Sequence, residues 1–95
     1  MFHKITKITP LPGLQLQASF ENGDMRLYDV NALMPRFPMF ESLKTINGLF
    51  ELVRVDTGGY GVVWNDELDL ASEEIWQSGQ LLDNSASGSV GEVSS

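Results

Sequence analysis

Residues 14–29 read LQLQASFENGDMRLYD, and this stretch decides the fold. Apolar and polar side chains alternate from Leu14 to Glu21, which is typical of a β-strand with one buried face. Asn22 and Gly23 follow, and this pair favours a two-residue type I′ turn, because both residues tolerate a positive φ. We therefore predict a β-hairpin with this turn at its tip.

A two-residue turn also predicts the register of the hairpin. It places Phe20 opposite Met25 and Leu16 opposite Asp29. The predicted buried face then consists of Leu14, Leu16, Ala18, Phe20, Met25 and Leu27. Asp29 falls on the same face, where a lone carboxylate is costly unless it accepts hydrogen bonds. We expect Asp29 to cap a helical turn over residues 30–34.

Three further strands are predicted from runs of β-branched and aromatic residues, over residues 2–9, 52–56 and 60–64. In the first run Ile5 and Ile8 have opposite parity, so we expect a bulge or an edge position there.

Short helices are predicted between and after these strands. Apolar residues at helical spacing fall at Phe40, Leu43, Ile46, Leu49 and Phe50. A final helix is predicted to begin at Ser72, with Glu73 and Glu74 near the positive end of its dipole, and to end at Gly79.

The chain therefore predicts an α+β fold with a small antiparallel sheet of about five strands and two or three short helices packed on one side. A chain of 95 residues allows one domain, which we place at residues 1–79. Residues 80–95 are rich in Ser and Gly, and we expect a flexible, disordered C-terminal tail there.

The charge is unevenly distributed along the chain. The net charge is −7, and residues 56–95 carry eight acidic side chains and no basic one. Binding to nucleic acid or to an anionic membrane needs clustered Lys and Arg, so we expect neither partner. The chain contains no run of about 20 apolar residues and no signal-peptide pattern, so we expect a cytoplasmic protein.

Few residues have the pattern of a catalytic or metal site. There is no cysteine and His3 is the only histidine, so we expect no metal, no cofactor and no enzymatic activity. Asp56-Thr57-Gly58 matches the tripeptide of aspartic proteases, but a turn that needs Gly after Thr explains it better. The acidic residues from Asp66 to Glu74 do not have the spacing of an EF-hand.

A family resemblance rests on short segments that occur in order. They are ITKITPL at residues 5–11, LQL at 14–16, FENG at 20–23, DV at 29–30, FESLK at 40–44, LF at 49–50, VRVD at 53–56, VVW at 62–64 and DL at 69–70. Over about residues 3–79 the chain resembles the DUF2442 family of small bacterial proteins of unknown function.

The resemblance implies a compact α+β fold with mostly antiparallel strands and no established catalytic residues. It also implies a gene beside that of a second small protein, in an arrangement suggestive of toxin–antitoxin pairs. Family members often have Pro after the Asp-Leu step, where this chain has Ala71. Some members are fused to a helix-turn-helix domain, for which only the Ser/Gly-rich segment remains here.

The leading hypothesis is a non-enzymatic protein-interaction or regulatory module, antitoxin-like, whose partner is the neighbouring gene product or a second copy. The candidate interaction residues are Asp66, Glu67, Asp69, Trp64 and Arg36. The alternative is a small-ligand-binding domain with an aromatic pocket around Trp64, lined also by Tyr60, Trp76 and Phe37. An enzyme that uses Asp29, Asp56 or Asp69 is the third hypothesis, and no spacing supports it.

Overall fold

The computed structural model describes residues 3–82. Its strands are β1 (Ile5–Leu11), β2 (Gln15–Phe20), β3 (Met25–Asp29), β4 (Arg54–Val55), β5 (Gly61–Asn65), β6 (Leu68–Ala71) and β7 (Gln80–Leu82). Its α-helices are α1 (Ser42–Thr45) and α2 (Ser72–Ser78), and 3₁₀ turns cover Val30–Leu33, Pro38–Glu41, Phe50–Leu52 and Thr57–Gly59.

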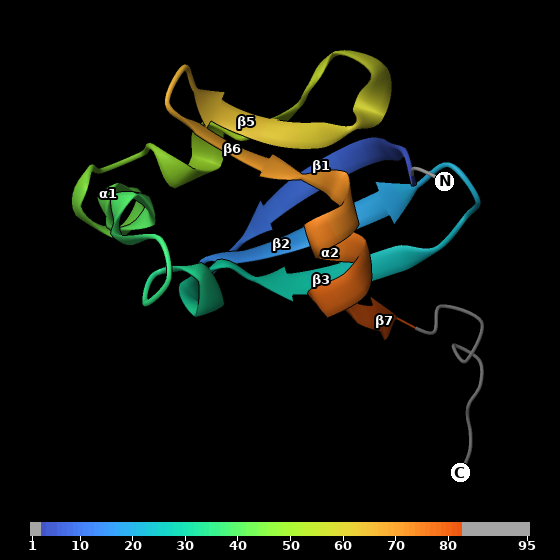
Figure 1. Cartoon of the computed structure of the whole chain (residues 1–95), viewed down its shortest axis with the longest axis horizontal. Coiled ribbons are helices and arrows are strands. Elements are labelled where there is room, and N and C mark those ends of the chain that lie inside the picture. The colour runs from blue at the N-terminus through green and yellow to red at the C-terminus, as the bar shows by residue number, and fades with distance from the viewer. Residues whose placement is uncertain (1–2, 83–95) are drawn as a thin grey trace, which may run out of the picture.

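The strands form two sheets instead of the predicted single sheet. Within residues 3–82 both sheets are antiparallel, with strand orders β1-β2-β3-β7 and β4-β5-β6 (Figure 1). The predicted α+β class is confirmed, but the prediction of one sheet of about five strands is wrong.

Two short strands account for part of the difference. In β6, Leu68 and Leu70 are buried while Asp69 and Ala71 are exposed, a period-two pattern too brief to stand out in the sequence. The three residues of β7 pair with β3, so residues 80–82, which the prediction assigned to the tail, belong to the four-stranded sheet. The rest of the predicted tail, residues 83–95, lies outside the described residues.

The turn between β2 and β3 has three residues, and the predicted type I′ turn is wrong. The N–H of Gly23 donates to the carbonyl oxygen of Phe20, and the N–H of Phe20 donates to that of Asp24. Gly23 has a φ of 98°, and within residues 3–82 the only non-glycine residue with a positive φ is Leu14. This is a type I turn followed by one left-handed glycine, and Asn22 contributes its Oδ1, which accepts from the N–H of Asp24 at 3.0 Å.

The extra turn residue shifts the hairpin register by one. Ala18 pairs with Arg26 and Leu16 pairs with Tyr28, so β3 turns Arg26 and Tyr28 toward the face that was predicted for Met25 and Leu27. The guanidinium carbon of Arg26 lies 4.1 Å from the ring centroid of Trp76, a cation–π contact on α2.

Asp29 is exposed as a result of the same shift, and its predicted place on the buried face is wrong. Its predicted role as a cap is confirmed. The Oδ1 atom of Asp29 accepts from the backbone N–H of Asn31 at 3.0 Å, at the start of the turn Val30–Leu33.

The predicted irregularity in β1 is confirmed as a register shift between Ile5 and Lys7. The strand continues through Pro10 to Leu11, further than predicted. Proline is tolerated there because β1 is an edge strand of its sheet, so no ladder hydrogen bond needs the missing N–H.

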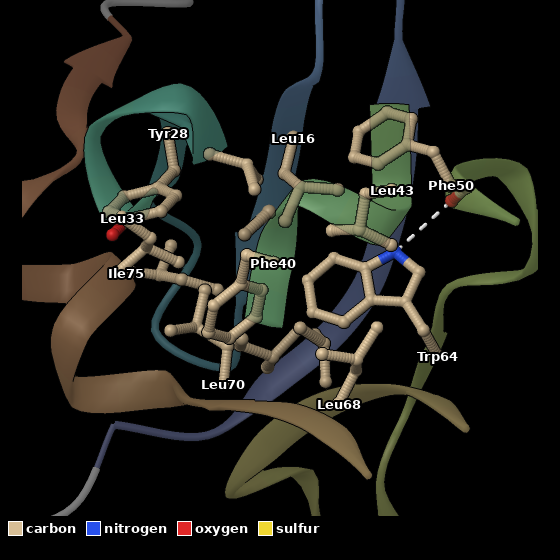
Figure 2. Close-up of a cluster of buried hydrophobic side chains, with 14 of the residues drawn as sticks. Leu16, Tyr28, Leu33, Phe40, Leu43, Phe50, Trp64, Leu68, Leu70 and Ile75 are labelled. Atoms are coloured by element: carbon tan, nitrogen blue, oxygen red, sulfur yellow. Dashed lines mark hydrogen bonds between the residues drawn. The ribbon is translucent and has the colours of Figure 1, made fainter. Parts of the chain in front are cut away.

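The core lies where side chains from both sheets, α2 and the segment 33–50 meet (Figure 2). Of the five apolar residues predicted on one helical face, Phe40, Leu43, Leu49 and Phe50 are buried. Ile46 is exposed because α1 ends at Thr45, after a single turn.

The two α-helices do not both pack on one side of a sheet, as was predicted. Figure 1 shows α2 across the face of the four-stranded sheet, whereas α1 lies beyond the ends of β2 and β3. The predicted limits of α2 are confirmed, since it begins at Ser72 and the N–H of Gly79 donates to the carbonyl oxygen of Ile75.

Replacing Gly23 by alanine tests the turn. We expect Gly23→Ala to lower the free energy of unfolding by about 1 kcal/mol, because a residue with a Cβ is strained at a positive φ. No heavy atom lies within 4 Å of the added Cβ, so backbone strain is the only cost. Gly23→Asn is the matched control, because Asn tolerates this conformation better, and urea denaturation should show a smaller loss. Equal losses for the two variants would contradict the assignment.

Candidate functional site

A groove of about 500 Å³ separates the segment 33–40 from β6 and the start of α2. Its lining residues are Leu33, Arg36, Phe37, Met39, Phe40, Glu67, Asp69, Leu70, Ala71 and Glu74. We call this hollow the acidic groove. It brings together two stretches of the chain, residues 33–40 and 67–74, that are about 30 residues apart in the sequence.

The acidic groove has an apolar floor and exposed apolar side chains. Leu33, Phe40 and Leu70 are buried and belong to the core, whereas Phe37 is 45% exposed and Met39 is 59% exposed. The rings of Phe37 and Phe40 meet edge to face with their centroids 6.4 Å apart. Phe37 is therefore held against the core while much of its surface faces solvent.

Arg36 is engaged by Glu74 at one end of the acidic groove. A guanidinium nitrogen of Arg36 lies 3.5 Å from Oε2 of Glu74, and the hydroxyl of Tyr28 donates to the same oxygen at 2.9 Å. Burial and the hydrogen bond to the Glu74 carboxylate both raise the pKa of the Tyr28 phenol above its usual value, so the phenol remains a donor.

The other two carboxylates of the acidic groove have no such partner. Glu67 and Asp69 are exposed, and within residues 3–82 no basic side chain forms an ion pair with either of them. Two exposed apolar side chains thus lie beside two carboxylates whose charge is not neutralised.

Two further hollows extend the acidic groove at its ends. One shares Arg36 and Glu74 with it and reaches Ser78. The other shares Met39 and Glu67 with it and reaches Ile46. The hollowed surface therefore continues along the whole of β6.

The predicted interaction residues do not all meet here. Arg36, Glu67 and Asp69 line the acidic groove, and Asp66 is exposed in the turn between β5 and β6 but does not line it. Met39 and Glu74 also line the acidic groove but were not predicted as interaction residues. For Met39 the sequence offered one signal, the stretch Pro35–Met39, in which apolar residues lie between and after two prolines.

The structure corrects the prediction for Trp64. Its side chain is 2% exposed, it packs edge to face against Phe40, and its indole N–H donates to the carbonyl oxygen of Phe50 at 3.2 Å (Figure 2). An aromatic on the buried face of a strand fills the core, so Trp64 does not line a surface pocket. Of the four aromatics predicted to form that pocket, Phe37 lines the acidic groove.

The tripeptide Asp56-Thr57-Gly58 forms a tight turn between β4 and β5, as the turn interpretation predicts. The Oδ1 atom of Asp56 accepts from the N–H of Thr57 at 2.8 Å, and the N–H of Asp56 donates to the carbonyl oxygen of Gly61. Gly58 has a φ of 87°, which explains the need for glycine after Thr57.

Comparison with known protein families shows to which family this chain belongs. A family model described as "Protein of unknown function (DUF2442)" matches residues 5–80. The chain belongs to the DUF2442 family. No curated protein and no solved structure matches this DUF2442 chain.

Within residues 3–82, no group of three or more His, Asp or Glu side chains is arranged to hold a metal ion. In the same residues, no helix has the length and apolar character to cross a membrane.

A second cluster of polar contacts attaches the beginning of the described chain to α2. The backbone N–H of His3 donates to Oε2 of Glu73 at 2.6 Å, and Nδ1 of the His3 ring lies 2.9 Å from the same oxygen. The His3 ring also stacks on Trp76 with centroids 3.7 Å apart. Hydrogen bonds from the His3 backbone and ring lower the pKa of the Glu73 carboxyl below its usual value.

This cluster predicts a dependence of stability on pH. Because the folded state lowers the pKa of Glu73, its ionised form contributes stability above the usual value of 4.5, and that contribution is lost as pH falls below it. We expect Glu73→Gln to remove this part of the acid dependence of urea denaturation. His3→Gln is the control that keeps the backbone donor, which has the largest effect, and it should retain most of the dependence. If Glu73→Gln unfolds with the same pH profile as the unmodified chain, the contact does not stabilise the fold.

Proposed function

We propose that this DUF2442 chain is a non-enzymatic protein-interaction module whose acidic groove binds a basic, partly apolar segment of another protein. One observation supports this most strongly: Phe37 and Met39 are exposed next to Glu67 and Asp69, and these carboxylates have no basic partner within residues 3–82. A partner that carries Lys or Arg beside apolar side chains complements both features.

The two features have different physical roles in such a complex. Burial of Phe37 and Met39 contributes apolar contact area to the binding free energy, because aromatic and Met side chains are enriched in protein interfaces. Glu67 and Asp69 contribute specificity and attract basic partners at long range. The net charge of −7 acts in the same direction and raises the association rate with a basic protein.

The biological role that we propose is the regulatory, antitoxin-like half of a small bacterial gene pair. It rests on the resemblance to DUF2442 and its gene arrangement, with the product of the neighbouring gene as the partner. A second copy of the chain complements the acidic groove less well, because its own net charge is negative.

Charge reversal in the acidic groove tests the proposal. We expect the double variant Glu67→Lys and Asp69→Lys to weaken binding of the neighbouring gene product by about tenfold or more, as measured by calorimetry of the purified proteins. Asp66→Lys is the matched control, since Asp66 is exposed in the same turn but outside the groove, and it should have a smaller effect.

A second substitution separates the apolar contribution from the charge. Phe37→Ser should weaken binding by about fivefold or more and should leave the salt dependence in place, because it removes no charge. Since Phe37 is already 45% exposed, the fold should remain intact by circular dichroism. Failure of the two proteins to associate at either low or high salt, or equal binding by all variants, would overturn the proposed function.

A further inference from the structure

The position of β6 suggests how the acidic groove holds its partner. In the sheet order β4-β5-β6, β6 is an edge strand, and within residues 3–82 its only strand neighbour is β5. An edge strand presents backbone N–H and C=O groups that are not used by its own sheet.

The hydrogen-bond pattern identifies the backbone groups on the free edge. The N–H of Ser72 donates to the carbonyl oxygen of Tyr60 at 2.9 Å, in the register that pairs Ala71 with Gly61. In antiparallel sheets hydrogen-bonded and non-hydrogen-bonded pairs alternate, so Leu70 faces β5, whereas Asp69 and Ala71 direct their backbone groups away from it. The N–H of Asp56 donates to the carbonyl oxygen of Gly61. The backbone groups of Gly61 therefore face β4, and they do not form hydrogen bonds with Ala71.

The acidic groove runs along this free edge. Asp69, Leu70 and Ala71 line it, and the opposite wall is formed by the side chains of residues 36–40. Residues 38–40 of that wall belong to a 3₁₀ turn that begins at Pro38, and residues 36 and 37 are in no strand, so the wall provides no strand to cover β6. The hollows that share lining residues at both ends allow an extended segment to pass along the whole strand.

We propose that the partner segment binds by β-strand addition to the free edge of β6, with basic and apolar residues in alternation. This inference rests on the proposed function and specifies its binding mode. The N–H and C=O of Asp69 and the N–H of Ala71 form backbone hydrogen bonds with the added strand.

The side-chain pattern follows from the geometry of paired strands. A residue directly opposite Asp69 points to the same side as the Asp69 carboxylate, which favours Lys or Arg there. The residues before and after it point to the side of Leu68 and Leu70, where Phe37, Met39 and Phe40 provide an apolar surface. The expected motif is therefore apolar-basic-apolar.

Charge favours a basic partner segment at β6 over residues 83–95 of this chain and over a second copy of the chain. Residues 83–95 of this chain contain two acidic side chains and no basic one, so they do not complement Glu67 and Asp69. Pairing of β6 with β6 of a second copy would bring the Asp69 carboxylates of the two copies near each other, and like charges on paired strands repel.

Titration of the full ¹⁵N-labelled chain with three synthetic peptides tests the binding mode. The first peptide alternates Lys and Val (acetyl-GVKVKVKVG-amide), the second has the same composition in blocks, and the third is the alternating peptide with N-methyl groups on alternate residues. We expect the alternating peptide to bind, and its saturation should shift the Asp69 and Ala71 amide protons downfield. The other two peptides should bind at least tenfold more weakly.

Ala71→Pro tests the backbone donor on the protein side. Ala71 has a φ of −69°, which proline adopts without strain, and its N–H faces away from β5, so the variant should fold with equal or higher thermal stability. It should bind the alternating peptide about three- to tenfold more weakly, because one hydrogen bond is lost. Ala71→Ser keeps the N–H and is the matched control, which should bind like the unmodified chain.

Each other outcome overturns the inference. Equal binding of the alternating and N-methylated peptides, or unchanged binding by Ala71→Pro, would show that the groove does not add a strand. Absence of binding by all three peptides would also overturn it. The proposed function is decided separately, by the effect of the Glu67 and Asp69 charge reversals on the partner protein.

Discussion

The left-handed conformation of Gly23 is the constraint on which the rest of the structure depends. It closes a three-residue turn and thereby sets the register between β2 and β3. That register turns Arg26 and Tyr28 toward α2, where one packs against Trp76 and the other donates a hydrogen bond to Glu74. A shift of one residue would replace both with Met25 and Leu27, and α2 would lose these two polar attachments to the sheet.

The acidic groove depends on this attachment. β6 leads directly into α2, so the position of α2 fixes the position of the free edge of β6. On the other side, Asp29 starts the turn Val30–Leu33 immediately after β3, and the prolines at positions 35 and 38 keep the following segment out of any strand. The two walls therefore approach each other without pairing, and a hollow with apolar and acidic side chains remains between them.

Local features could be predicted from the sequence, because each depends on residues close in the chain. The alternation in β2, the Asp29 cap, the irregularity in β1 and the limits of α2 are of this kind. The register of the hairpin could not be predicted, since the Asn-Gly pair fits turns of two or three residues, which differ by one register step. For the site, the charges and the irregular segment between the two prolines correctly indicated Arg36, Glu67 and Asp69. The place of Trp64 in the core could not be predicted, because the sequence pattern of a strand is the same whether its aromatic residue lines a pocket or fills the core.

By itself the sequence determined the α+β class, most of the local elements, the family and the concentration of negative charge after residue 55. These properties follow from composition, from short-range periodicity and from the order of short segments. Only the tertiary structure decided that there are two sheets, that Arg26 and Tyr28 face inward, and that Phe37 and Met39 lie beside Glu67 and Asp69. The physical reason is that the groove and the contacts of Arg26 and Tyr28 with α2 join residues about 30 or more positions apart, and the division into two sheets depends on how the strands and helices pack around one shared core.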